Sequence, residues 1–405
     1  MFNSNSGRAA GGVSKIILLT LGAIAIRLLV VFRHSSIMPP SGDTEAYFAM
    51  ARFLATGKGP AILSHPPMYP IFLMFTDVLS GGPLWITWVA QALLGALIVP
   101  MTYGLGRRIH SDLAGLCAAA WCAVDPFQIT MTQVLLSETL FTALLIVGLW
   151  TLATAYERQS TALFAWAGAL LSLAALTRSV LLPLAGYFIV MALLEPKTAP
   201  AYRCVRAVAF TVAFSVPMAG WSLVVRHMTG HWLVASVQKG WNSYEGLNPD
   251  FDDPGAIARW QAGMFHEMYD HHLQDPVELD NYFWQKTKTV VGLHPFRTVK
   301  LMARKFFKFW RIWPYFPYGL GQRIISGAFM IPLLLLMMWG CWGEWSRRST
   351  APWMSGVLMG FVLFYALLNT MTWTQIRYRI PIHPVLEIYA AMGLARWLRP
   401  RGDSC

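Results

Sequence analysis

Charged residues are scarce in this chain: Asp, Glu, Lys and Arg make up 13% of its 405 residues, whereas 56% are hydrophobic. An ordinary soluble domain contains about 25% charged residues. The scarcity excludes a typical soluble globular protein and predicts a chain that lies in a lipid bilayer.

Cysteine is rare as well. The chain has five, and none lies in the long polar stretch 226–322, so a disulfide framework is excluded. There is no internal repeat or low-complexity tract. The first apolar run, 16–32, lacks a small-residue cleavage site, and we therefore expect it to be a retained helix rather than a secretory signal.

Long apolar windows are what the chain does contain. Spanning a bilayer as a helix takes about 20 mainly apolar residues. Shorter apolar runs at 112–124 and at 161–194, the second interrupted at Arg178, add three spans to the clear ones. The predicted fold class is therefore an all-α polytopic membrane protein with about ten transmembrane helices. The clear windows are 14–33, 84–105, 133–154, 206–226, 323–343, 351–372 and 381–398.

The distribution of Lys and Arg predicts the orientation. Basic residues such as Arg107, Arg203 and Arg347 gather in one alternating set of connections, which the positive-inside rule assigns to the cytoplasm together with both termini. The loop 34–82 and the segment 226–322 then face outward, which is the periplasm for a bacterial inner membrane. The net charge of +12 is explained by these flanks and one basic helix, so we expect no nucleic-acid partner.

Three parts follow along the chain. Residues 1–225 form an N-terminal transmembrane module that includes the loop 34–82, residues 226–322 form an external segment, and residues 323–405 form a C-terminal transmembrane module. Within the external segment, 296–313 alternates cations and aromatic residues at helical spacing. This pattern predicts an amphipathic helix at the membrane interface.

The stretch "GDTEAYFAMARFLAT" (42–56) predicts a short external helix with two acids, Asp43 and Glu45, in its first turn. Carboxylates at this position are commonly only helix caps, because they interact favourably with free backbone N–H groups and the helix dipole. Acids near the mouth of a membrane helix bundle, however, often mark functional sites. Both interpretations remain open on this pattern alone.

Several passages in order resemble the C-type (GT-C) glycosyltransferases, in the branch of protein O-mannosyltransferases and aminoarabinose lipid A transferases. The first external loop carries the clearest likeness, and the similarity extends over most of the chain as loose patterns. The passages are "GDTEAYFAMARFLATGKGP", "HPPMYPIFL", "SETLFTALLIVGLW", "AGALLSLAALTRSVLLPL", "GWSLVVRHMTGHWLVAS" and "RYRIPIHPVLEIYAAMGL".

The resemblance implies a GT-C-like helix bundle with outward-facing loop helices. It also implies a transferase that moves a sugar from a polyprenyl-phosphate carrier to an acceptor hydroxyl on a lipid, glycan or protein. Asp43 occupies the position of the family's catalytic base. Glu45 is the second catalytic candidate, although Thr44 separates it from Asp43 where members often have adjacent acids.

The leaving phosphate requires cations or a metal to stabilise its developing charge. Arg178, Arg377 and Arg379 are the outward-side candidates, since guanidinium groups bind phosphate through paired donors. Of the alternating pair, we expect Arg377 to face the cavity and Arg379 the lipid headgroups. The alternative for all three is that they only reach toward headgroups.

Secondary site candidates are His65, Tyr69 and Glu138. No cofactor is certain; a divalent metal ion is possible, although "FHEMYDHH" (265–272) lacks the paired-histidine spacing of a zinc site. The alternative function is a lipid or sugar transporter or flippase without covalent chemistry. The lack of repeat symmetry disfavours it.

Overall fold

The computed structural model describes residues 4–34, 42–59, 61–82, 84–313, 319–346, 352–372 and 374–398. These residues form seventeen α-helices and no strand. The predicted all-α class is therefore confirmed.

The helices before the external segment run from α1 to α10. The long helices α4 and α10 each continue through an internal proline, Pro100 and Pro217. Their bounds are α1 Ser4–His34, α2 Gly42–Thr56, α3 Met68–Leu73, α4 Leu84–Ile109, α5 Asp112–Ala123, α6 Pro126–Met131, α7 Glu138–Arg158, α8 Thr161–Ala175, α9 Leu182–Leu194 and α10 Pro200–Thr229. A π-helix, Met74–Val78, extends α3, and a 3₁₀ turn, Ser179–Leu181, precedes α9.

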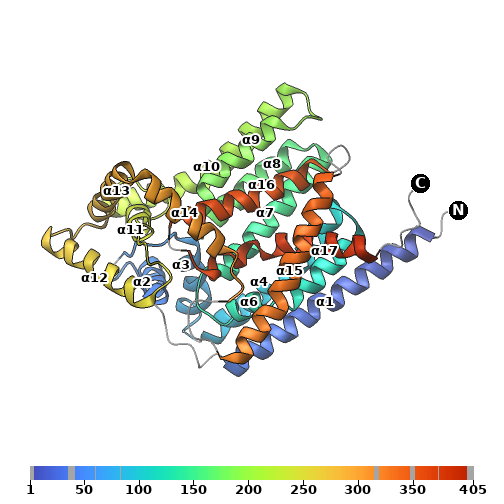
Figure 1. Ribbon diagram of the computed structural model, residues 1–405, viewed down its shortest axis with the longest axis horizontal. Helices are drawn as coiled ribbons and strands as arrows, with labels where there is room; N and C mark the ends of the chain where they lie inside the picture. Colours follow the sequence, from blue (N-terminus) through green and yellow to red (C-terminus); the bar gives the residue numbers. More distant parts are fainter. Residues whose placement is uncertain are drawn as a thin grey trace.

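Four helices lie in the described part of the segment that the sequence predicts to be external, 226–313, and three follow it. The four are α11 Lys239–Glu245, α12 Pro254–Asp270, α13 Pro276–Leu293 and α14 Pro295–Phe309. They are followed by α15 Leu320–Ser346, α16 Trp353–Thr370, the 3₁₀ turns Ile376–Tyr378 and Ile380–Ile382, and α17 His383–Leu398. Figure 1 shows α2 and α11 to α13 gathered at one end of the helix bundle.

Among the described residues, six helices are long and apolar enough to cross a membrane, by length and composition: α1, α4, α7, α10, α15 and α16. They match six of the seven clear windows, and the protein is a multi-pass membrane protein. The seventh window forms α17, with 16 residues, and the three shorter predicted spans form α5, α8 and α9. The most buried of the six is α7: 83% of the residues in its apolar window are buried, against 17–56% in the other five helices.

Small residues let these helices approach closely. A Cβ added to Gly168 of α8 would collide with the carbonyl oxygen of Phe210 in α10, and one on Gly340 of α15 would collide with the Tyr389 carbonyl of α17. Close backbone approach at glycine is typical of helix packing in membranes, where van der Waals contact replaces much of the hydrophobic driving force. Glu138, the first residue of α7, lies at the end of this helix next to Arg178 and Arg377.

The outer helices form a small core of their own. Trp241 and Tyr244 of α11 both pack on Phe283 of α13, at ring-centroid distances of 5.2 and 5.3 Å, and Tyr244 also lies 5.5 Å from Trp260 of α12. Asp280 accepts hydrogen bonds from the backbone N–H groups of Gly240 and Trp241, which fixes the start of α11. The segment is thus a packed unit docked on the bundle.

Candidate active site

Asp43 lies in the first turn of α2, as the sequence predicts, with its carboxylate directed to two partners outside the helix. Oδ2 accepts a hydrogen bond from Nη2 of Arg377 at 3.0 Å, and Oδ1 lies 3.7 Å from Nε2 of His65. The neighbouring Thr44 hydroxyl donates to the Leu135 carbonyl just ahead of α7. Asp43 is therefore held in a network between α2 and the turn that precedes α17.

Glu138 joins the two arginines of the site. Its Oε1 accepts a hydrogen bond from Nη1 of Arg178 at 2.6 Å and lies 3.8 Å from Nε of Arg377. Its side chain is only 2% exposed, whereas those of Asp43, Arg377 and Arg178 are 34%, 26% and 17% exposed. The four side chains form a chain of alternating charge, Asp43, Arg377, Glu138 and Arg178, in which Glu138 is the most buried member.

Aromatic rings enclose this charge chain. Tyr378 lies beneath both guanidinium groups, with its ring centroid 4.9 Å from Cζ of Arg178 and 5.1 Å from Cζ of Arg377. Such stacking leaves the edge of a guanidinium group free to donate hydrogen bonds. The rings of His65, Tyr47 and Tyr69 form a second wall, with centroid distances of 4.5 Å from Tyr47 to His65 and 4.8 Å from Tyr47 to Tyr69.

The charges control the protonation of Asp43. Burial by itself would raise the pKa of this carboxyl, but the charge of Arg377, with smaller contributions from His65 and Arg178, holds the pKa below its usual value. Burial lowers the pKa of His65, and the nearby Asp43 carboxylate offsets only part of that effect. Asp43 is thus ionised at neutral pH, and Arg377 is the main group that lowers its pKa.

Six of the eight predicted site residues come together here: Asp43, His65, Tyr69, Glu138, Arg178 and Arg377. Glu45 lies on the exposed side of α2 and makes no hydrogen bond or ion pair with another described residue. The sequence did not single out Tyr378 as a site residue, since nothing in a lone tyrosine signals that the distant Arg178 stacks on it together with the adjacent Arg377.

Arg379 does not lie where the sequence predicts. We expected it to reach lipid headgroups, but its side chain is fully buried. Its Nη1 donates to the carbonyls of Phe309 and Arg311, both at 2.8 Å, at the end of α14. A guanidinium group with several fixed donors suits this task, because the last carbonyls of a helix have no partner within the helix. Arg379 therefore stabilises the contact between its own turn and the end of α14, and it does not face the site.

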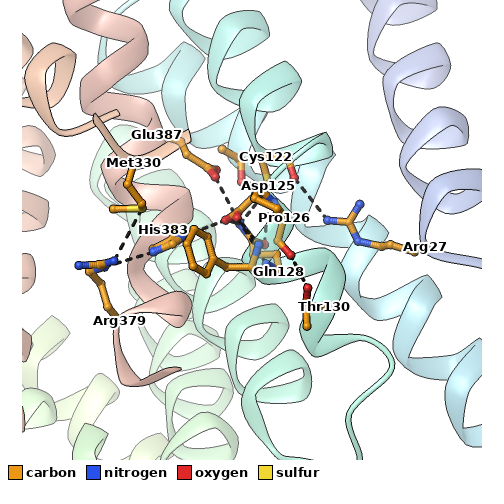
Figure 2. Close-up of polar contacts among 12 residues, drawn as sticks. Arg27, Cys122, Asp125, Pro126, Gln128, Thr130, Met330, Arg379, His383 and Glu387 are labelled. Carbon is orange, nitrogen blue, oxygen red and sulfur yellow. Dashed lines mark hydrogen bonds and ion pairs between the residues drawn. The ribbon is translucent and has the colours of Figure 1, made fainter. Parts of the chain in front are cut away.

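A second polar cluster lies deeper in the bundle. His383 lies between Arg379 and Asp125, and Glu387 faces Asp125 from the same helix, α17 (Figure 2). The distance from His383 Nδ1 to Asp125 Oδ2 is 2.8 Å, Arg379 Nε donates to His383 Nε2 at 3.4 Å, and Gln128 Nε2 donates to Asp125 at 3.0 Å. All of these side chains are at most 4% exposed.

Asp125, His383 and Glu387 form the one group of possible metal ligands that are close enough together among the described residues. The hydrogen bonds do not fit a metal. Because Arg379 donates to Nε2, the other ring nitrogen carries the proton and donates to Asp125, so neither nitrogen has a free lone pair. The guanidinium groups of Arg27 and Arg379 also line the cluster and would repel a divalent cation. We interpret it as a structural connection between the α5–α6 turn and α17.

Comparison with known proteins agrees with this architecture. Residues 64–221 match the family model described as dolichyl-phosphate-mannose-protein mannosyltransferase. The AglB oligosaccharyltransferase of Archaeoglobus fulgidus, solved in complex with an inhibitory peptide and a dolichol-phosphate, superposes with a TM-score of 0.59 at 14% identity, over 96% of this chain and 50% of that one. The chain has a C-type glycosyltransferase fold. The resemblance predicted from the motifs is thereby confirmed.

A further match is ArnT of Cupriavidus metallidurans in the apo state, with 14% identity over 96% of this chain and 78% of that one, at a TM-score of 0.46. The chain spans about half the length of the oligosaccharyltransferase chains that it matches. No curated protein sequence matches it.

Proposed function

We propose that this chain is a membrane glycosyltransferase that moves a sugar from a polyprenyl-phosphate donor to an acceptor hydroxyl on the outer, periplasmic side of the membrane. The observation that carries the proposal is the charge chain of Asp43, Arg377, Glu138 and Arg178. It joins α2, α7, the turn before α9 and the turn before α17. Glu138 and Arg178 lie within residues 64–221, which match the mannosyltransferase family model, and Asp43 and Arg377 lie outside that stretch.

The roles follow from exposure and charge. Asp43 is the most exposed of the four groups and is ionised, so it acts as the general base that takes the proton of the acceptor hydroxyl. The hydroxyl oxygen forms a bond to the anomeric carbon as the bond from that carbon to the phosphate oxygen breaks. The proton ends on Asp43, and the electron pair leaves with the carrier phosphate.

Arg377 and Arg178 bind that phosphate. Both stack on Tyr378 and are held by the buried Glu138, so their guanidinium groups are arranged before the donor arrives. Preorganised donors stabilise developing charge without reorganisation during the reaction. A phosphate that draws Arg377 away from Asp43 also removes the charge that lowers the pKa of Asp43, and the carboxylate becomes a stronger base when the donor is bound.

The dolichol-phosphate bound to the related archaeal fold supports a polyprenyl-phosphate donor, and the bound peptide is compatible with a protein acceptor. Lipid and glycan acceptors remain alternatives. The charge chain by itself supplies cations for the phosphate, and assays with and without a chelator decide whether a divalent metal ion takes part as well.

The test is consumption of radiolabelled polyprenyl-phosphate sugars by the purified full chain with a crude envelope acceptor. We expect one donor to be consumed, and Asp43→Asn to bind that donor while its rate falls about 10²- to 10⁴-fold, the range typical of losing a general base. Glu45→Gln is the matched control and should keep wild-type activity. No consumption of any donor, or an active Asp43→Asn protein, contradicts the proposal and favours a transporter.

A further inference from the structure

Lys305 is the most unusual side chain of the external segment. It lies on α14, which the sequence predicts to be amphipathic, between the exposed Arg304 and Lys308, yet it is fully buried. Its Nζ donates to the carbonyl oxygen of Gly246, at the end of α11, and to that of Thr372, in the turn after α16, at 2.5 and 2.7 Å. A buried ammonium that is hydrogen-bonded only to carbonyls is costly to desolvate, so this contact is not a by-product of packing.

The Lys305 contact is matched by a second one in the opposite direction. Arg379, in the turn, donates to the carbonyls of Phe309 and Arg311 at the end of α14. Lys305 therefore reaches from α14 into the turn at Thr372, and Arg379 reaches back from the turn to α14. Arg377 lies between these two fixed points in the chain.

The backbone is close-packed at the same place. A Cβ added to Gly246 would lie 2.6 Å from the carbonyl oxygen of Met371 and 3.0 Å from Cα of Thr372. Only glycine allows α11 to approach the turn this closely. The contact thus joins three elements, α11, α14 and the turn that carries Arg377.

We propose that Lys305 and Arg379 form a two-point clamp that positions Arg377 against Asp43, so that the external helices α11 and α14 set the geometry of phosphate binding. The part that concerns phosphate rests on the proposed function. Lys305 and Arg379 are positioning residues, because they act through Arg377 and contact no substrate. Burial lowers the pKa of Lys305 to about 7, with nearby Glu245 opposing, because the buried ammonium is costly to desolvate.

The experiment compares Lys305→Met with Lys300→Met, an exposed lysine on the same helix. Modification of Arg377 by phenylglyoxal, followed by mass spectrometry of the peptide that contains it, reports whether the guanidinium is held in its ion pairs. We expect Lys305→Met to speed this modification several-fold and Lys300→Met to leave it unchanged. In the transfer assay, Lys305→Met should lower kcat by about 10- to 100-fold, the effect of misplacing a binding group by about 1 Å, with the KM for acceptor unchanged.

A second variant covers a failure of Lys305→Met to fold. Gly246→Ala keeps the ammonium but forces α11 and the turn apart, and it should produce the same faster labelling of Arg377. Wild-type labelling rates in folded Lys305→Met or in Gly246→Ala overturn the clamp. Labelling requires no donor, so a wild-type chain that consumes no sugar contradicts the proposed function and leaves the test of the clamp intact.

Discussion

Two clusters built from the same kinds of residues differ in how exposed their side chains are. The charge chain at Asp43 and the cluster at Asp125 each combine carboxylates, a histidine and arginines. At Asp43 the groups are 15–34% exposed, apart from Glu138. At Asp125 the groups are fully buried and bonded mainly to one another. Exposure, not residue type, separates a site from a structural connection.

Breaking the deep cluster should have the largest effect on stability. Asp125→Asn replaces the buried carboxylate that accepts hydrogen bonds from His383 and Gln128, and each buried donor left unsatisfied costs about 1–3 kcal/mol. We expect a clearly lower melting temperature in detergent, measured by scanning fluorimetry. Donor binding by the protein that remains folded should be unchanged, and a loss of affinity without a loss of stability would place Asp125 in the site.

Weakening the exposed cluster at Asp43 should lower the affinity for polyprenyl phosphate more than it lowers stability. Arg178→Lys keeps the charge but loses the planar, forked donors, and charge-assisted hydrogen bonds contribute about 1.5–3 kcal/mol. The dissociation constant for polyprenyl phosphate should rise about tenfold or more, as measured by titration calorimetry. Arg259→Lys, on the exposed side of α12, serves as the control. Equal affinities of Arg178→Lys and the wild type would mean that Arg178 only supports Glu138.

The smallest effect is expected in the pH profile. The folded-state pKa of Asp43 is lowered, so its ion pair contributes stability above the usual carboxyl pKa and loses it as the pH falls through the lowered value. Arg377→Met removes the main lowering charge, and burial then raises the pKa of Asp43. The acid limb of kcat/KM should therefore move to higher pH in this variant, because that limb reports the essential base of the free enzyme. An unmoved limb would assign it to a group other than Asp43.

The sequence predicted the helices well because each needs only local information. Apolar windows, the acids at the start of α2 and the break at Arg178 all lie within short stretches, and the bilayer imposes a fixed length on spanning helices. The same holds for α14, whose charged and aromatic residues sort at helical spacing. The predicted site residues came largely from a family resemblance over the same stretches.

The partners of those residues depend on contacts between distant parts of the chain. Asp43 and Arg377 are 334 positions apart, and Arg379, two residues further on, turns inward to α14 instead of outward to lipid. Lys305 belongs by periodicity to a basic helix and by packing to the turn at Thr372. The sequence by itself determined the class, the spans and the candidate acid. Only the tertiary structure decided which cations are exposed enough to bind a ligand, because burial depends on what packs against each side chain and not on its neighbours in sequence.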